Sequence, residues 1–165
     1  MVTVRRIRAD EGQQLKALRI RALGESPDAF GSTQVDALGE PDACWAGRAA
    51  EDALSGESII VIAYEGVAWL GMARAHFEDP DESLVELTSL WVEPSRRGSG
   101  IATSLCDALV VWAKERGARR LQLWVTETNV EATRLYARLG FVATGERQPV
   151  RPGSCLREVQ MVRDV

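Results

Sequence analysis

The order of apolar and polar positions divides the chain into short segments with distinct periods. Segments that alternate, or stay apolar over several residues, predict strands, and apolar residues spaced three or four apart predict helices. We expect strands at 2–8, 58–66, 67–77, 84–92 and 119–125, followed by a terminal strand pair in FVATGERQ and SCLREVQMV. We expect helices at 41–54, 99–115 and 129–140, and an earlier helix whose apolar side carries Leu15, Leu18 and Leu23.

Residues between these segments predict where the elements begin and end. Asp10 can cap the first helix, and Pro41 suits the first turn of the second. The cluster of Ser, Pro, Asp and Gly at 25–34 predicts a loop, and the acidic segment 78–82 predicts a solvated turn. Gly117 is placed to end the helix at 99–115.

Taken in order, the elements are a strand, two helices, three strands, a helix, a strand, a helix and two strands. This order predicts an α/β fold, with a central mixed sheet flanked by about four helices. The chain has 165 residues and shows no repeat or long linker. We therefore expect one domain over 1–165.

Composition narrows the class of protein. The net charge of -4 argues against binding nucleic acid by neutralising its phosphates. No apolar run is long enough to span a bilayer, and the N-terminal segment lacks the pattern of a signal peptide, so we expect no membrane partner. The three cysteines are far apart and form no Cys-x-x-Cys pair, which favours a reducing, cytoplasmic setting without a metal site.

A glycine-containing segment, VEPSRRGSGIATSL, joins the strand at 84–92 to the helix at 99–115. Gly98 and Gly100 would let the backbone approach an anion and turn its N–H groups toward it, beside the positive end of the helix. The adjacent Arg97 can bind phosphate, and Arg96 can help or face water. Nearby hydroxyl donors are Ser99, Thr103 and Ser104. The segment fits a phosphate cradle, but also a structural turn with surface arginines.

Two familiar nucleotide loops do not fit this segment. A Walker A loop needs a lysine after its last glycine, and none is present. A dinucleotide-binding loop needs a third glycine where this chain has Thr103. It also needs an acidic residue where this chain has Arg119 and Arg120.

A second motif changes this picture. Residues 97–102 match the pattern Gln/Arg-x-x-Gly-x-Gly/Ala, and NVEATRLYARLGF at 129–141 matches Asn-x-x-Ala-x-x-Leu-Tyr-x-x-x-Gly-Phe. Together with LTSLWVEP before the first motif, they make the chain resemble the GCN5-related N-acetyltransferase (GNAT) superfamily. The resemblance runs from about Ile59 to Gly145.

The resemblance implies that the chain transfers acetyl from acetyl-CoA directly to a primary amine of a small molecule or peptide. It implies that Arg97 and the following backbone bind the CoA pyrophosphate, and that the strand end at 90–92 runs beside the pantetheine. Tyr136 takes the family position of the acid that protonates the CoA thiolate. Asn129 would contact CoA, act as a plain helix N-cap, or do both. The implied cofactor-binding residues are Leu90, Trp91, Val92, Arg97, Gly98, Ser99, Gly100, Ile101, Ala102, Thr103, Asn129 and Tyr136.

Glu86 is the candidate general base, because an amine with a pKa of about 10.4 must lose a proton before it attacks. A glutamate inside an apolar strand is unusual, and family members with a glutamate base on this strand carry it at the matching place. Alternation would put Glu86, Thr88, Leu90 and Val92 on one face of the sheet. An ion pair with an arginine, or an exposed sheet face, would explain the same residue.

Three other side chains have structural interpretations. His76, the single histidine, is expected to be a partly exposed strand residue. Cys106 lies on the helix after the glycine loop, where its spacing indicates packing rather than nucleophilic catalysis. On the helix at 129–140, Leu135 and Leu139 are expected to pack inward, with Tyr136 just off that stripe.

The sequence leaves the function, the length of the acyl chain and the acceptor open, and an acyltransferase that uses a longer acyl chain is one of the alternatives. A phosphate loop with an uncertain base also fits a non-catalytic acyl-CoA-binding sensor or interaction module. In this family the acceptor side is lined by the segments that correspond here to 25–34 and 146–154, and their mixed side chains name no substrate. The resemblance also makes a homodimer the assembly to test.

Overall fold

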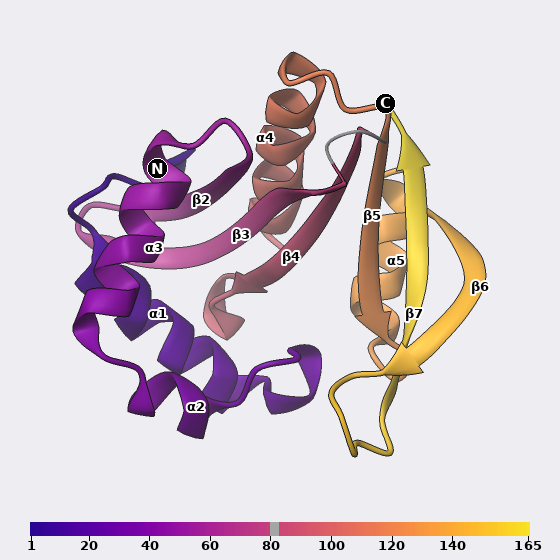
Figure 1. Ribbon diagram of the computed structural model, residues 1–165, viewed down its shortest axis with the longest axis horizontal. Coiled ribbons are helices and arrows are strands. Elements are labelled where there is room, and N and C mark those ends of the chain that lie inside the picture. Colours follow the sequence, from indigo (N-terminus) through magenta and orange to yellow (C-terminus); the bar gives the residue numbers. More distant parts are fainter. Residues whose placement is uncertain (80–82) are drawn as a thin grey trace.

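The protein forms one seven-stranded mixed sheet in the order β1-β2-β3-β4-β5-β7-β6 (Figure 1). The computed structural model describes residues 1–79 and 83–165. The strands are β1 Thr3–Arg6, β2 Ser58–Glu65, β3 Ala68–Asp79, β4 Leu84–Val92, β5 Arg120–Thr126, β6 Val142–Pro149 and β7 Arg157–Asp164. The helices are α1 Gly12–Glu25, α2 Gln34–Gly39, α3 Asp42–Leu54, α4 Ile101–Glu115 and α5 Val130–Arg138. The predicted α/β fold with a mixed sheet is confirmed.

Helices cover both faces of the sheet, and each face has its own apolar core. On one face α1 and α3 pack through residues such as Leu15, Leu18 and Trp45. On the other, α4 packs through Leu105 and Leu109, and α5 extends the same core. In Figure 1, α1, α2 and α3 gather beside the N-terminal strands, and α5 lies along β5 and β7. No described helix is long and apolar enough to cross a membrane.

The sheet opens between β4 and β5. These two strands are parallel and pair only over Leu84–Leu87 and Arg120–Leu123. Among the described residues, β5 pairs with β7 alone from Trp124 onward, and the second half of β4 pairs with β3 alone. Figure 1 shows β4 and β5 diverging. Trp91 and Trp124 both lie beyond the last β4–β5 pair, on the separated parts of these strands.

A bulge interrupts β4 just above the last β4–β5 pair. Thr88 faces Arg74 across the ladder and Trp91 faces Met72, so two residues of β4 oppose one of β3. Ser89, inside the bulge, has a φ of 58°, which is uncommon for a residue with a side chain. A bulge of this kind inserts one residue and changes which face the following side chains occupy.

The bulge makes the prediction of a single shared face wrong. Val85 and Leu87 lie in the core beneath α4, so Glu86 and Thr88 face α1 and α3. Beyond the bulge, Trp91 joins the α1–α3 core, and the strand-end residues Leu90 and Val92 pack on the α4 side. The extra residue reverses which side chains of β4 face α4 and which face α1 and α3. A bulge of this kind cannot be recognised in an apolar run of sequence.

Several element ends also differ from the predictions. The residue before α1 is Glu11 rather than Asp10, and the Glu11 carboxylate accepts hydrogen bonds from Arg5 and from the backbone of Arg8. Pro41 is itself the cap position of α3. The segment expected to be a loop contains a 3-10 turn at Pro27–Ala29, and the short helix α2 follows it. In the segment expected to be a turn at 78–82, β3 continues to Asp79 and residues 80–82 lie outside the described ranges.

Candidate active site

The glycine loop lies at the wide end of the opening, between the end of β4 and the start of α4. Gly98 and Gly100 have φ angles of 76° and 87°, a region in which side-chain-bearing residues are strained. A Cβ at either position would meet no atom within 4 Å, so the backbone conformation rather than crowding calls for glycine. The positive φ angles explain why glycine is needed at these two positions. The loop backbone is left uncovered.

The loop presents backbone donors rather than hydroxyl donors. The first intrahelical bond of α4 runs from the N–H of Ser104 to the carbonyl of Gly100, 3.0 Å, so the N–H groups of 101–103 have no partner within the helix. The hydroxyl of Ser99 donates to the carbonyl of Arg96 at 2.5 Å, and that of Ser104 donates to Gly100 at 3.2 Å. Of the three expected hydroxyl donors, these two are already used inside the loop.

Arg97 is bound within the protein instead of projecting freely. Its Nε donates to the carbonyl of Val92 at 3.0 Å, and its Nη2 lies 2.7 Å from the Glu25 carboxylate. The indole N–H of Trp91 donates to the same carboxylate oxygen at 2.9 Å. Burial of Glu25 raises its pKa, but hydrogen bonds from Ser26, Arg97 and Trp91 outweigh this and lower it to about 2. The end of α1 is therefore fastened to the end of β4.

Glu86 lies at the narrow end of the opening, half-buried beside β5. Its Oε1 accepts a hydrogen bond from Nε2 of Gln122 at 3.4 Å, and its Oε2 lies 3.5 Å from Nε2 of His76. Burial raises the pKa of the Glu86 carboxyl, and the nearby Glu78 carboxylate adds to the increase. Within residues 1–79 and 83–165 no arginine forms an ion pair with Glu86. Glu86 is also partly buried, so it does not lie on an exposed face of the sheet.

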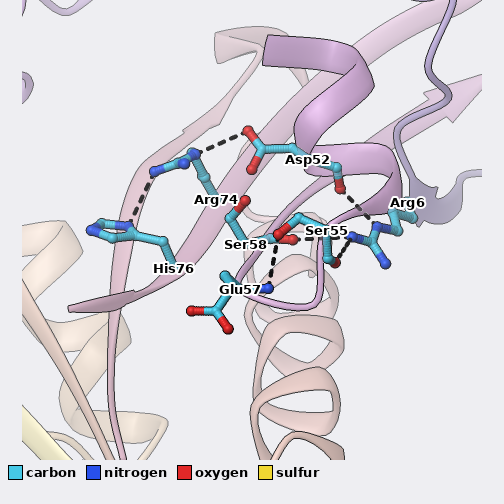
Figure 2. A network of polar contacts seen from close by, with 7 residues as sticks. All are labelled: Arg6, Asp52, Ser55, Glu57, Ser58, Arg74 and His76. Carbon is cyan, nitrogen blue, oxygen red and sulfur yellow. Dashed lines mark hydrogen bonds and ion pairs between the residues drawn. The ribbon is translucent and has the colours of Figure 1, made fainter. Parts of the chain in front are cut away.

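His76 is closer to the candidate chemistry than its sequence indicates. It faces Glu86 directly across the β3–β4 ladder, and its side chain is 25% exposed. Its Nδ1 lies 3.1 Å from Arg74 Nη1, and Arg74 Nε donates to Asp52 at 3.1 Å, as Figure 2 shows. Burial lowers the pKa of His76, and Arg74 lowers it further, so the ring is neutral at pH 7. A polar chain therefore joins α3 to Glu86.

The same residues include a candidate metal cluster. Ligand atoms of His76, Glu78 and Glu86 all lie within 4.8 Å of one another. Arg74 can only donate, so Nδ1 of the neutral His76 must accept, and the ring proton sits on Nε2. Nε2 then donates toward the Glu78 and Glu86 carboxylates, at 3.2 Å and 3.5 Å. The contacts support a hydrogen-bonded group at this place.

Tyr136 and Asn129 are placed by α5. Tyr136 packs into the core together with Ala132 and Leu139, and its ring meets Phe141 edge-on at 5.9 Å between centroids. The prediction that Tyr136 falls off the packing stripe is wrong, because residues 132, 136 and 139 form the inner side of this helix. Burial raises the pKa of the Tyr136 phenol. The Asn129 side-chain oxygen accepts from the N–H of Ala132 at 3.1 Å, which makes it the N-cap.

Cys106 is a packing residue, as expected. It is buried in the core beneath α4, and burial raises the pKa of its thiol to about 12. A thiol with so high a pKa stays protonated at neutral pH and is a poor nucleophile. The structure therefore gives Cys106 a packing role.

Glu86 and Tyr136 lie on opposite faces of the sheet. Glu86 faces α1 and α3, whereas Tyr136 packs in the core shared with α4. The carboxyl group of Glu86 and the phenol of Tyr136 therefore lie on different sides of the sheet.

On the Glu86 side of the sheet a cavity of about 400 Å³ lies between the strands and α1, α2 and α3. It reaches Thr88 and Ser89 of the bulge, and Arg19, Trp45 and Asp52 are among its walls. None of these three was singled out from the sequence, because only the packing of α1 against α3 brings them together.

The two segments expected on the acceptor side meet in the structure. Arg151, from the loop after β6, donates to the carbonyl of Pro27 at 2.8 Å and to that of Phe30 at 3.4 Å. Thr126 at the end of β5 donates to the carbonyl of Asp28 at 2.7 Å. These contacts hold the segment after α1 against the C-terminal strands.

Comparison with known proteins agrees with this geometry. The sequence profile of the Acetyltransferase (GNAT) family matches residues 26–141, more than half of the chain. The chain belongs to the GNAT family. An uncharacterised N-acetyltransferase of Methanocaldococcus jannaschii is 41% identical to this GNAT protein over 58 residues. That match spans 35% of this chain and 26% of the length of the relative.

Solved structures share the whole fold of this GNAT protein. An acetyltransferase of the GNAT family from Streptococcus pneumoniae superposes with a TM-score of 0.86 over 100% of both chains, at 21% identity. The Salmonella typhimurium protein yncA, solved with its cofactor acetyl-CoA, gives 0.78 over 99% of this chain and 94% of that one, also at 21% identity. At these identities the likeness shows the fold.

Proposed function

We propose that this GNAT protein transfers the acetyl group of acetyl-CoA directly to a primary amine. The observation that carries the proposal is the opening between β4 and β5. It has uncovered backbone donors of the glycine loop at its wide end and Glu86 at its narrow end. A long, thin donor with a phosphate group at one end and a reactive thioester at the other fits such a site.

The loop residues would hold the pyrophosphate of CoA. The N–H groups at the start of α4 and the positive end of its dipole favour an anion there. Trp91 is buried and its indole is bonded to Glu25, so this part of β4 would contact the pantetheine through its backbone. Asn129 uses its side-chain oxygen as a cap, which leaves its NH₂ group for CoA.

Direct transfer then requires two proton movements. The amine nitrogen bonds to the thioester carbonyl carbon, and the C–S bond breaks as the CoA thiolate leaves. Glu86 accepts the proton that the nitrogen loses, directly or through water. The Tyr136 phenol donates a proton to the thiolate as it leaves, and the phenolate regains a proton from water before the next turnover.

The first test is the release of free CoA thiol from acetyl-CoA in the presence of a panel of primary amines and peptides. We expect release that depends on at least one amine. Absence of release with every amine at high enzyme concentration would contradict the proposal. Stabilisation of the protein by CoA under those conditions would identify the acyl-CoA-binding module instead.

A second test addresses Glu86. We expect Glu86→Gln to lower kcat by about 100-fold, a typical contribution of a positioned general base. Its KM for acetyl-CoA should change little, because the side chain lies at the far end of the opening from the glycine loop. The matched control is Glu115→Gln, at the exposed C-terminal end of α4. Unchanged turnover in Glu86→Gln would remove its assignment as the base.

A further inference from the structure

The cavity on the α1–α3 face has polar groups that the protein itself does not satisfy. Three of its buried atoms lack a hydrogen-bond partner in the described part of the chain: Nη1 of Arg19, Nε1 of Trp45 and Oδ1 of Asp52. Trp45 and Asp52 are only 3% and 2% exposed, so bulk water does not reach them freely. Unpaired buried polar atoms cost free energy, and such atoms at one cavity indicate a ligand that pairs with them.

Arg19 is the strongest of these groups because it carries a full charge. It forms no ion pair with any described residue, and its guanidinium stacks over the Phe30 ring with Cζ 4.6 Å from the centroid. Burial lowers the pKa of Arg19 to about 10, and the second cationic group, Arg48, contributes to this. Glu40, the acid in its surroundings, is already paired with Arg48 at 2.6 Å. Arg19 therefore remains cationic and without a carboxylate partner.

The combination of donors and acids in the cavity selects the kind of anion. Arg19 and Trp45 both donate, and two nitrogen donors match the two oxygens of a carboxylate. The walls also contain the acidic residues Asp36, Glu40 and Glu51, whose repulsion is about twice as large for a doubly charged phosphate as for a singly charged carboxylate. Asp52 Oδ1 offers an acceptor for an N–H or O–H group of the same ligand. The volume of about 400 Å³ is in the range of small-molecule sites.

We infer that the acceptor is a small amine that also carries a carboxylate, as an amino acid does. This inference rests on the proposed acetyl transfer, because it concerns the second substrate of the same site. The carboxylate binds Arg19 and Trp45 in the cavity, and the amine lies toward Thr88 and Ser89 of the bulge. From there it reaches the opening in which Glu86 lies, and the net charge of the ligand stays near zero.

The test compares amino acids with the amines that lack only the carboxylate. Suitable pairs are L-leucine with 3-methylbutylamine, L-phenylalanine with phenethylamine, and L-histidine with histamine, each with saturating acetyl-CoA and read by thiol release. We expect kcat/KM to be at least about 30-fold higher for the better amino acids than for their decarboxylated partners. Equal or higher values for the partners would overturn the inference.

Variants locate the effect in the cavity. Arg19→Gln should remove most of the preference for the carboxylate, so that kcat/KM falls much more for each amino acid than for its decarboxylated partner. Trp45→Phe keeps the ring but removes one donor, and it should reduce the preference in the same direction even if Arg19→Gln folds poorly. The control is Arg120→Gln, on the exposed end of β5, where Arg120 pairs with Asp164. An equal loss for both members of each pair in Arg19→Gln would contradict the inference.

Binding without turnover separates this inference from the proposed function. Equilibrium dialysis with the same radiolabelled pairs, in the presence of CoA, reports the cavity alone. Carboxylate-dependent binding that Arg19→Gln abolishes, combined with no thiol release, would leave the cavity assignment standing and remove the transferase. Thiol release that does not depend on the carboxylate would support the transferase and remove the cavity assignment.

Discussion

Glu86 shows how the chemistry of one side chain depends on residues that are distant in the sequence. Its position in an apolar strand predicted a special role, and the structure places it at the narrow end of the opening. Its partners His76 and Gln122 come from the two neighbouring strands. The sequence could not pair them, because register across a sheet is set by long-range contacts. His76 is the partly exposed strand residue that the sequence predicted, but its contact with Glu86 could not be predicted, for the same reason.

The burial of Glu86 gives a stability prediction. Its pKa is raised on folding, so the folded protein binds a proton more tightly than the unfolded chain does. The stability from this proton is present below the unfolded pKa of about 4.3 and is lost as pH rises through the folded pKa. Glu86→Gln, which cannot ionise, should therefore be more stable than the original protein at pH 7, although it is less active.

Thermal unfolding over a pH series checks this prediction. The advantage of Glu86→Gln should be present at pH 7 and should shrink as pH falls toward 4, where Glu86 is itself protonated. Glu115→Gln, from an exposed site, should show no such trend. A Glu86→Gln variant that is less stable than the original protein at pH 7 would mean that the carboxylate is held by its partners more strongly than burial disfavours it.

At the scale of elements, regular patterns were predictable and interruptions were not. The long helix α4 and the strands β2 to β5 follow from period and length, and their buried residues agree with the patterns. The bulge at Ser89 and the short helix α2 were missed. A bulge changes one backbone angle, and α2 buries only Ala37, so neither leaves a periodic signal. The glycine loop was predictable because its residue types are restricted by its conformation.

The glycine loop gives a prediction for an element that ends in a binding site. Gly100→Ala places a side chain at a φ of 87°, which costs about 1–2 kcal/mol. Its Cβ would also project into the open space proposed for the pyrophosphate. We expect lower stability and a raised KM for acetyl-CoA, measured by thermal unfolding and steady-state kinetics.

The same substitution inside α3 is the control. Gly47 has an ordinary helical conformation, and a Cβ there would meet nothing within 4 Å. Gly47→Ala should raise stability by about 1 kcal/mol, through the better helix propensity of alanine, without changing the KM. If both substitutions changed stability and KM alike, the loop would have no special backbone requirement.

At the scale of the whole molecule, the opening proposed as the donor site lies between two parts of the sheet. One half of the sheet, β1 to β4, is joined to β5, β7 and β6 by the four residue pairs between β4 and β5 and by the core beneath α4. The sequence predicted the order of the elements along the chain and a mixed sheet. It did not predict the strand order or the place at which two strands separate, since these depend on what the strands pack against.

A ligand that fills the opening should stabilise the whole protein. At about 100 times its dissociation constant, CoA should add about 2.7 kcal/mol to the free energy of unfolding. Pantetheine, which lacks the pyrophosphate, should bind more weakly and shift the melting temperature less at the same concentration. Equal shifts for both compounds in thermal unfolding would show that the glycine loop does not hold the phosphates.

The division of the sheet also links the stability of the protein to the rate at which it can release its product. In the proposed reaction, a donor that fills the space between β4 and β5 would stabilise the sheet only while it is bound, and each turnover would have to release it as CoA. Stronger contacts along the opening would make the protein more robust and would slow the departure of the product. The short pairing at Leu84–Leu87 is therefore a compromise in the proposed reaction. Fewer contacts between β4 and β5 lower the stability of the free protein, but they allow the product CoA to leave.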